Sequence, residues 1–121
     1  MNIEIIPCLN DNYSYLIKDE QTDIVAIIDP SEFTPCDEKI NSKFKKLDYI
    51  LNTHHHFDHV GGNTELKKKY GSKILGFEKD EKRIPEIDIL LKDGQEFNIG
   101  NLNFKTIFIP GHTSGHVAFY F

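Results

Sequence analysis

Residues 53–59 read Thr-His-His-His-Phe-Asp-His, and this stretch decides how the rest of the chain is interpreted. It follows directly on an apolar run, Tyr49 to Asn52, which is typical of a buried strand. Next comes a segment that reads as a helix, with Asn63 as its N-cap, Tyr70 as its last residue and Gly71 after its end. A strand, a polar loop and a helix in this order predict a layered α/β protein with a site at the carboxyl end of a strand.

The first third of the chain is rich in short β-branched and aromatic runs. We expect strands at Ile3–Ile6, Tyr13–Lys18 and Ile24–Ile28, joined by turn-like polar segments into a meander that opens a sheet. The third run is apolar throughout, which is typical of a strand covered on both faces. Residues 36–46 are expected to form a helix before the strand that leads into the histidines.

Further strand signals follow the predicted helix. Lys73–Leu75 is expected to return as a strand. The runs Glu96–Ile99 and Leu102–Ile109 flank Gly100-Asn101, which predicts a hairpin with a two-residue turn. Residues 116–121 predict a last strand. The second cluster of histidines begins where the long second strand of the hairpin ends, so both clusters follow strands.

All six histidines fall into two short windows of the sequence. In an extended segment the side chains alternate, so His54 and His56 point to the same side. Two imidazoles, together with a third from a distant loop, make a three-nitrogen zinc site that keeps an open position for water. His112 is the candidate third ligand. His55 and His116 are assigned to the surface or to a structural role.

Asp58 and His59 provide ligands for a second cation. If the chain turns into a helix after residue 57, these two side chains point to a neighbouring spot rather than to the first metal. Two cations about 4 Å apart can share one hydroxide and stabilise both the attacking and the leaving group. Such a bound water loses its proton near a pKa of about 7. Asp58 is assigned a catalytic role as well as a ligand role.

Composition and charge exclude several classes of protein. A chain of 121 residues with 39% hydrophobic and 27% charged residues is typical of one folded domain. The net charge of −5 argues against a nucleic acid as partner, and no apolar run is long enough to cross a membrane. The N-terminus lacks the pattern of a secretory signal, which predicts a cytoplasmic protein in which Cys8 and Cys36 are reduced structural thiols.

The pattern His54-x-His56-x-Asp58-His59 is similar to the signature of the metallo-β-lactamase superfamily, whose fold is an αββα sandwich with the metals at the sheet edge. The segments around it are more specific. Taken in order and at these intervals, they resemble glyoxalase II, the family of hydroxyacylglutathione hydrolases. The segments are residues 7–17 (Pro-Cys-Leu-Asn-Asp-Asn-Tyr-Ser-Tyr-Leu-Ile), 28–30 (Ile-Asp-Pro), 53–63 (Thr-His-His-His-Phe-Asp-His-Val-Gly-Gly-Asn) and 110–116 (Pro-Gly-His-Thr-Ser-Gly-His).

The resemblance implies the hydrolysis of S-lactoylglutathione to glutathione and lactate at a centre of two divalent metal ions. Zinc is the first expectation, and iron or manganese occurs in other members. By the family pattern, His54, His56 and His112 bind the first metal, and Asp58 and His59 bind the second. The substrate is then a small-molecule glutathione thioester, with no nucleic acid or membrane as partner.

The chain departs from the family pattern at its end. The family completes its centre with a bridging aspartate and a further histidine, and it binds glutathione partly with a C-terminal helical domain. All of these lie beyond the segment at 110–116, so residues 1–121 are interpreted as the N-terminal part of an α/β (α+β) sandwich with a partial site. We therefore expect a poor or inactive hydrolase. We also expect an exposed apolar sheet face through which copies self-associate, or against which a second fragment packs.

Three other functions stay open at this point. A persulfide dioxygenase with one iron, or a relative that opens lactones or β-lactams, keeps the fold and changes the reaction. A non-catalytic metal-binding fragment keeps only the ligands. A nuclease of the same superfamily is disfavoured by the net charge of −5 and by the absence of a basic cluster near the histidines.

Overall fold

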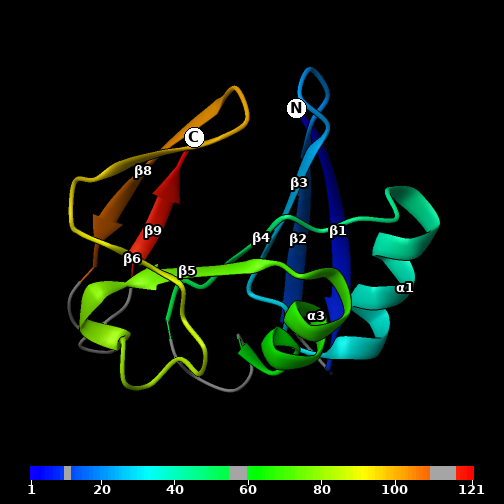
Figure 1. Cartoon of the computed structure of the whole chain (residues 1–121), viewed down its shortest axis with the longest axis horizontal. Coiled ribbons are helices and arrows are strands. Elements are labelled where there is room, and N and C mark those ends of the chain that lie inside the picture. The colour runs from blue at the N-terminus through cyan, green and yellow to red at the C-terminus, as the bar shows by residue number, and fades with distance from the viewer. Residues whose placement is uncertain (10–11, 55–59, 110–116) are drawn as a thin grey trace.

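Two β-sheets form the centre of the computed structural model, which describes residues 1–9, 12–54, 60–109 and 117–121 (Figure 1). The larger sheet has the order β1-β2-β3-β4-β5-β6 and the smaller one the order β7-β8-β9. The strands of the larger sheet are β1 (Asn2–Cys8), β2 (Asn12–Asp19), β3 (Ile24–Ile28), β4 (Tyr49–Leu51), β5 (Lys73–Phe77) and β6 (Ile89–Leu91). Those of the smaller sheet are β7 (Glu96–Ile99), β8 (Leu102–Phe108) and β9 (Val117–Tyr120).

Strand direction changes across the larger sheet. The meander β1-β2-β3 is antiparallel, as predicted, whereas β3, β4, β5 and β6 pair in parallel. Parallel pairing places the carboxyl ends of β3, β4 and β5 along one edge of the sheet. The segment with the first histidines leaves the sheet from this edge, directly after β4.

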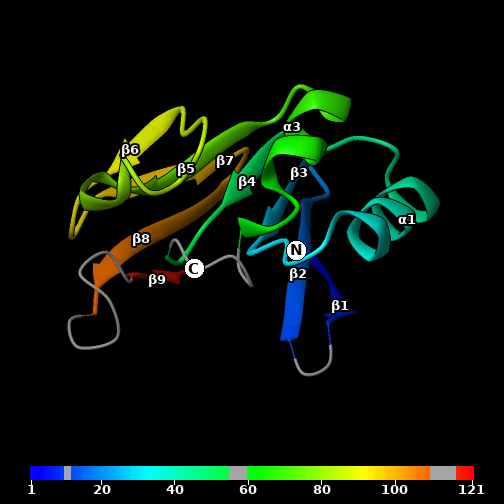
Figure 2. The ribbon, with the colours of Figure 1, turned by 90° about the horizontal axis from the view of Figure 1, so that it is seen from below.

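The larger sheet is covered on one face by helices and, over its central strands, on the other face by the smaller sheet, which produces two apolar cores. The outer strands β1 and β2 leave Ile3, Ile5, Tyr13 and Tyr15 exposed on that second face. Helices α1 (Phe33–Lys43) and α3 (Asn63–Tyr70) pack on one face, around buried Ile27 and Ile50. The smaller sheet packs on the other face, around Ala26, Leu51 and Phe104. Successive residues of β3 thus enter different cores, which explains why its sequence is apolar throughout. Figure 2 shows α1 and α3 well apart from β8 and β9.

The first helix begins and ends three residues earlier than predicted, at Phe33 and Lys43 instead of 36 and 46. Pro35 lies in its first turn, where a missing N–H costs no intrahelical hydrogen bond. The helix ends where Lys45 adopts a φ of 59° and its N–H donates to Ile40 O at 2.8 Å. Neither feature is visible in hydrophobic periodicity, on which the prediction rested.

The start of α3 also differs from the prediction. Gly62, not Asn63, is the N-cap, and Asn63 is the first residue of the helix, with its side chain buried. The predicted end is confirmed, because Gly71 is the C-cap in the left-handed conformation, with a φ of 69°. The side chain of Asn63 is therefore available for another purpose.

The remaining predictions concern strands. The hairpin of β7 and β8 at Gly100-Asn101 is confirmed, with Ile99 opposite Leu102. Strand β5 extends two residues beyond the predicted Leu75. Strand β6 and a short 3₁₀ helix, η1 (Glu78–Asp80), were not predicted, because their polar and apolar residues show no clear period.

In the part of the chain that the structure describes, no helix has the length and apolar character needed to cross a membrane.

The two cysteines lie together between β1 and α1. Both are buried and free, and the Cys8 and Cys36 Sγ atoms are 3.8 Å apart. Burial, and then the neighbouring Cys8, raise the pKa of the Cys36 thiol to about 12. Because the thiolate is the reactive form, the Cys36 thiol is chemically quiet. Both cysteines pack as part of the core, as predicted.

Candidate metal centre

His54 is the predicted ligand that lies within the described residues. It follows β4 at the carboxyl edge of the parallel strands, and its side chain is only 3% exposed. The predicted ligands His56, Asp58 and His59 lie in residues 55–59, and His112 lies in residues 110–116. These four, like His55 and His116, lie outside the described residues.

A chain of hydrogen bonds leads from the end of β3 to His54. The backbone N–H of Thr53 donates to Asp29 Oδ1 at 2.8 Å, and Thr53 Oγ1 donates to Asp29 Oδ2 at 2.5 Å. Thr53 Oγ1 also lies 3.0 Å from His54 Nδ1. Asp29 is itself buried and held, since its backbone N–H donates to Leu51 O at 2.9 Å. The Asp29 carboxylate, just after β3, thus fixes Thr53 and through it His54, just after β4.

This chain determines which nitrogen of His54 carries the proton. The hydroxyl proton of Thr53 is directed to Asp29, so its oxygen is left to accept from His54 Nδ1–H. Nε2 is then the basic nitrogen of the ring. Histidines that bind metal commonly donate their other N–H to an oxygen acceptor, which fixes the ring and its tautomer. The described residues around His54 therefore fit a metal ion bound at Nε2.

The histidine segment is also held at both ends. Asn63 Nδ2 donates to Asn52 Oδ1 at 2.6 Å, and Asn52 Nδ2 donates to Asn63 Oδ1 at 3.3 Å. Gly62 N donates to Pro30 O at 2.8 Å. A Cβ atom at Gly62 would lie 3.1 Å from that same oxygen, which explains why a glycine stands there. Residues 52 and 63 thus meet at the base of the segment.

The strands on either side of the second histidine window, β8 and β9, meet the end of β4. Phe108, near the end of β8, is paired with Val117, the first residue of β9. The N–H of Val117 donates to Thr53 O at 2.8 Å, one residue before His54. Phe108 and Val117, which flank residues 110–116 in the sequence, therefore lie near Thr53.

An aromatic pair and a lysine lie at this edge as well. The rings of Phe77, at the end of β5, and Phe108 are stacked at a centroid distance of 5.0 Å. Lys79 Nζ lies 5.3 Å from the centre of the Phe108 ring. Sequence reasoning missed these three residues and the roles of Asp29, Asn52 and Asn63. The only hint in the sequence was that an asparagine stands at each end of the histidine segment, at positions 52 and 63.

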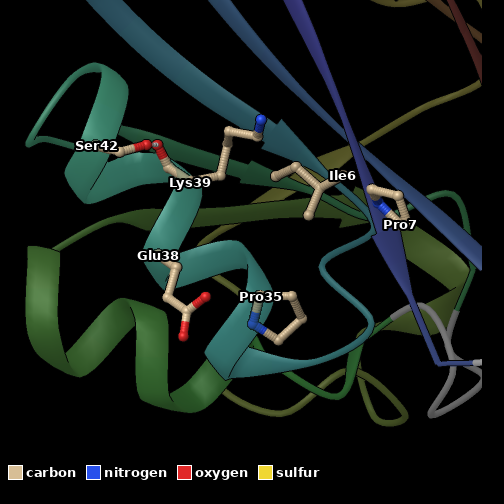
Figure 3. Close-up of a pocket in the computed structure, with 6 residues that line it drawn as sticks. All are labelled: Ile6, Pro7, Pro35, Glu38, Lys39 and Ser42. Carbon is tan, nitrogen blue, oxygen red and sulfur yellow. Dashed lines mark hydrogen bonds between the residues drawn. The ribbon is translucent and has the colours of Figure 1, made fainter.

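A hollow of about 390 Å³ lies elsewhere, between β1 and α1 (Figure 3). Its described lining contains none of the histidines. Lys39 extends from α1 toward β1, whereas Glu38 turns away from it (Figure 3). The lining residues are Ile6, Pro7, Pro35, Glu38, Lys39 and Ser42. Nothing in this lining converges on one point, so the candidate site remains the edge at His54.

The chain belongs to the metallo-beta-lactamase superfamily, whose family model matches residues 9–121. This family implies a centre of divalent metal ions, in agreement with the arrangement around His54. The fold agrees with solved structures as well. The structure of the B3 metallo-beta-lactamase BLEG-1 matches with a TM-score of 0.88 at 20% identity. The match covers 99% of this chain and 67% of the BLEG-1 chain. ETHE1 from Myxococcus xanthus has a TM-score of 0.81 at 25% identity, covering 98% of this chain and 53% of its own.

More similar relatives carry the name hydroxyacylglutathione hydrolase. The one from Pelagibacter ubique is 54% identical over 121 residues, all of this chain and 51% of its own length. The one from Methylococcus capsulatus is 47% identical over 116 residues, 96% of this chain and 45% of its own. The chain thus spans about half the length of these relatives.

Proposed function

We propose that the chain provides the greater part of the metal site of a thioester hydrolase that converts S-lactoylglutathione and water to glutathione and lactate. The observation that carries the proposal is the Asp29–Thr53–His54 chain at the end of β4, with Val117 bonded to Thr53 beside it. The 54% identity, over all of this chain and 51% of the relative, to a hydroxyacylglutathione hydrolase supports the substrate class, a small-molecule glutathione thioester.

In this proposal the ligands are the five residues identified from the sequence. His54, His56 and His112 bind one divalent ion, with zinc as the first expectation, and Asp58 and His59 bind a second. When bound, the metal lowers the pKa of a water molecule toward about 7, which supplies the nucleophile. The role of the described residues is to hold His54 Nε2 unprotonated and in a fixed direction. Asp58 is the proposed catalytic carboxylate.

The metal site is tested by the metal content of the purified chain. We expect bound zinc in the wild type and its loss in His56→Ala and in His112→Ala, because each change removes one imidazole from the same ion. Ser72→Ala is the control, since Ser72 Oγ donates to Leu47 O on a different edge of the sheet. Unchanged metal per chain in both histidine variants would show that the ligand assignment is wrong.

Turnover of S-lactoylglutathione tests how complete the site is. Five ligands divide as three for one metal and two for the other, and a site with two protein ligands holds its ion weakly. We therefore expect turnover by the 121-residue chain to be slow or undetectable even with metal added. An ordinary enzymatic rate would show that these residues suffice. Metal binding without any turnover in a chain extended to the full length of the relatives would instead favour a non-catalytic metal-binding protein.

We also propose that copies of the chain associate through the outer part of the larger sheet. On the face away from α1, the hairpin of β1 and β2 exposes Ile3 (49%), Ile5 (56%), Tyr13 (55%) and Tyr15 (41%). The pairing places Ile5 opposite Tyr15, so these side chains form one apolar surface. We expect light scattering to show a dimer or larger assembly and Ile5→Lys to shift it toward the monomer. A wild-type monomer at all concentrations would contradict the proposal.

We place the protein in the cytoplasm. The support is the pair of buried free thiols, Cys8 and Cys36, whose Sγ atoms are 3.8 Å apart, an arrangement suited to a reducing compartment. Fractionation of cells that produce the chain tests this. Recovery with a periplasmic or secreted fraction would contradict it.

A further inference from the structure

We infer that Asn52 and Asn63 are positioning residues for the proposed metal centre, acting as a staple that closes the histidine segment at its base. The inference rests on the proposed function, because it assigns these amides a role toward the metal ligands between them. Neither residue is a ligand. Their effect is on how well the ligands are arranged before a metal arrives.

The geometry of the pair is reciprocal. Each amide donates to the oxygen of the other, at 2.6 Å from Asn63 and at 3.3 Å from Asn52. Asn52 is 0% exposed and Asn63 is 1% exposed. Buried amides that satisfy each other are costly to separate, because each then loses a partner away from water. The contact therefore fixes the two residues at a short distance.

The position of the pair gives it a function beyond packing. Asn52 follows β4 and is anchored to β5 by its backbone N–H, which donates to Leu75 O at 2.9 Å. Asn63 is the first residue of α3. Four of the five proposed ligands lie between them in the sequence, at positions 54, 56, 58 and 59. Joining the ends of a segment removes conformations in which its ligands are dispersed, so less order has to be created when a metal binds.

Helix capping does not explain the residue at position 63. An asparagine before a helix normally caps it, but here Gly62 is the N-cap and the Asn63 side chain bonds to Asn52 instead. The side chain of Asn63, which could cap a helix, instead makes a contact with Asn52 across the base of the histidine segment. Gly62 reinforces that base through its bond to Pro30 O at 2.8 Å.

The test compares metal affinity with the stability of the metal-free protein in Asn52→Ala, Asn63→Ala and the double variant. Zn²⁺ affinity is measured by competition with a chromogenic chelator, and the ligand geometry by the visible absorption of bound Co²⁺. We expect each single change to weaken Zn²⁺ binding by about tenfold, the lower end for groups that orient metal ligands, and to alter the Co²⁺ spectrum. The double variant should have about the same Zn²⁺ affinity as the single variant with the lower affinity, because the two amides act as one unit.

A control asparagine pair lies in the β7–β8 hairpin, where Asn103 Nδ2 donates to Asn98 Oδ1 at 2.9 Å at an exposed position. Asn103→Ala also removes an asparagine pair, but one that does not border the histidines, and it should leave Zn²⁺ affinity unchanged. If an alanine variant fails to fold, replacement of both amides by leucine keeps the shape of the pair and should show the same loss of affinity.

Three results would overturn the inference, and they differ from one another. Lower melting temperatures of the metal-free variants, with Zn²⁺ affinity and the Co²⁺ spectrum unchanged, would assign the pair to fold stability alone. Equal loss of affinity in Asn103→Ala would show a non-specific effect. A wild-type chain that binds neither ion would reject the proposed function, and the positioning role with it.

Discussion

At the scale of single residues, Asp29 and Thr53 are as informative as the histidines. Asp29 adopts a φ of 51°, a backbone conformation that few residues other than glycine tolerate at low cost. In that conformation its carboxylate accepts two bonds from Thr53, and Thr53 accepts one from His54. The unusual backbone of one residue thus serves the orientation of another, which lies 25 positions later in the numbering.

Thr53→Val tests this chain of hydrogen bonds. Valine has nearly the same shape but removes the hydroxyl, so Asp29 loses one donor and His54 Nδ1–H loses its acceptor. We expect the free energy of unfolding to fall by about 1–2 kcal/mol and Zn²⁺ affinity to fall by about tenfold. The nitrogen chemical shifts of the His54 ring should also show a weaker preference for the Nδ1–H tautomer. Thr53→Ser keeps the hydroxyl and should resemble the wild type, and equal effects of both changes would contradict the account.

At the scale of elements, α3 shows how a helix can be specified at one end by its sequence and at the other by its neighbours. Gly71 ends the helix because its φ of 69° suits the C-cap, and its N–H donates to Lys67 O at 2.8 Å. At the other end, the side chain of Asn63, the first residue of the helix, is held by Asn52.

Gly71→Ala tests the C-cap. A Cβ atom at Gly71 would meet nothing within 4 Å, so the only cost is that of the left-handed backbone. We expect a loss of about 1 kcal/mol in the free energy of unfolding. Gly71→Asn should lose less, because asparagine adopts this conformation more readily than alanine. Chemical denaturation of the three proteins measures the difference, and an alanine variant as stable as the wild type would contradict it.

At the scale of the whole molecule, the two sheets are joined at one end by Asp19. This carboxylate belongs to the last residue of β2 and accepts from Thr22 Oγ1 at 2.6 Å and from the backbone N–H of Asn101 at 2.7 Å. Asn101 lies in the β7–β8 turn, next to Gly100 with a φ of 58°. A Cβ atom at Gly100 would lie 2.0 Å from Thr22 Oγ1, so only glycine permits this approach of the sheets.

The stability of this junction should depend on pH. The hydrogen bond from Thr22, and then the one from Asn101, hold the pKa of Asp19 below its ordinary value of 3.8. Because the pKa is lower in the folded chain than in the unfolded one, ionised Asp19 stabilises the fold above about pH 4, and this contribution is lost as the pH falls through the lowered pKa. We expect Asp19→Asn to differ from the wild type more at about pH 7 than at about pH 3. Urea denaturation measures this, with exposed Glu20→Gln as the control, and a difference independent of pH would contradict it.

Much of the fold could be predicted from local patterns. The runs Ile24–Ile28 and Glu96–Ile99 became strands, and Gly71 and Gly100 marked a helix end and a turn, because backbone conformation and side-chain period are local properties. Strand β6 and the limits of α1 could not be predicted. They depend on pairing with β5 and on the backbone at Lys45, which periodicity does not record.

The candidate site divides in the same way. The sequence by itself indicated the superfamily, which the family model over residues 9–121 confirms. It also predicted the ligand types and their spacing, because histidine and aspartate chemistry and the alternation of an extended segment need no tertiary contact, and this ligand set stays a prediction. Only the tertiary structure decided how the site is held. Asp29 bonds to Thr53 because the parallel strands β3 and β4 bring their carboxyl ends to one edge. Asn52 bonds to Asn63 of α3, and Val117 of β9 bonds to Thr53, and such contacts between residues distant in the sequence exist only in the folded chain.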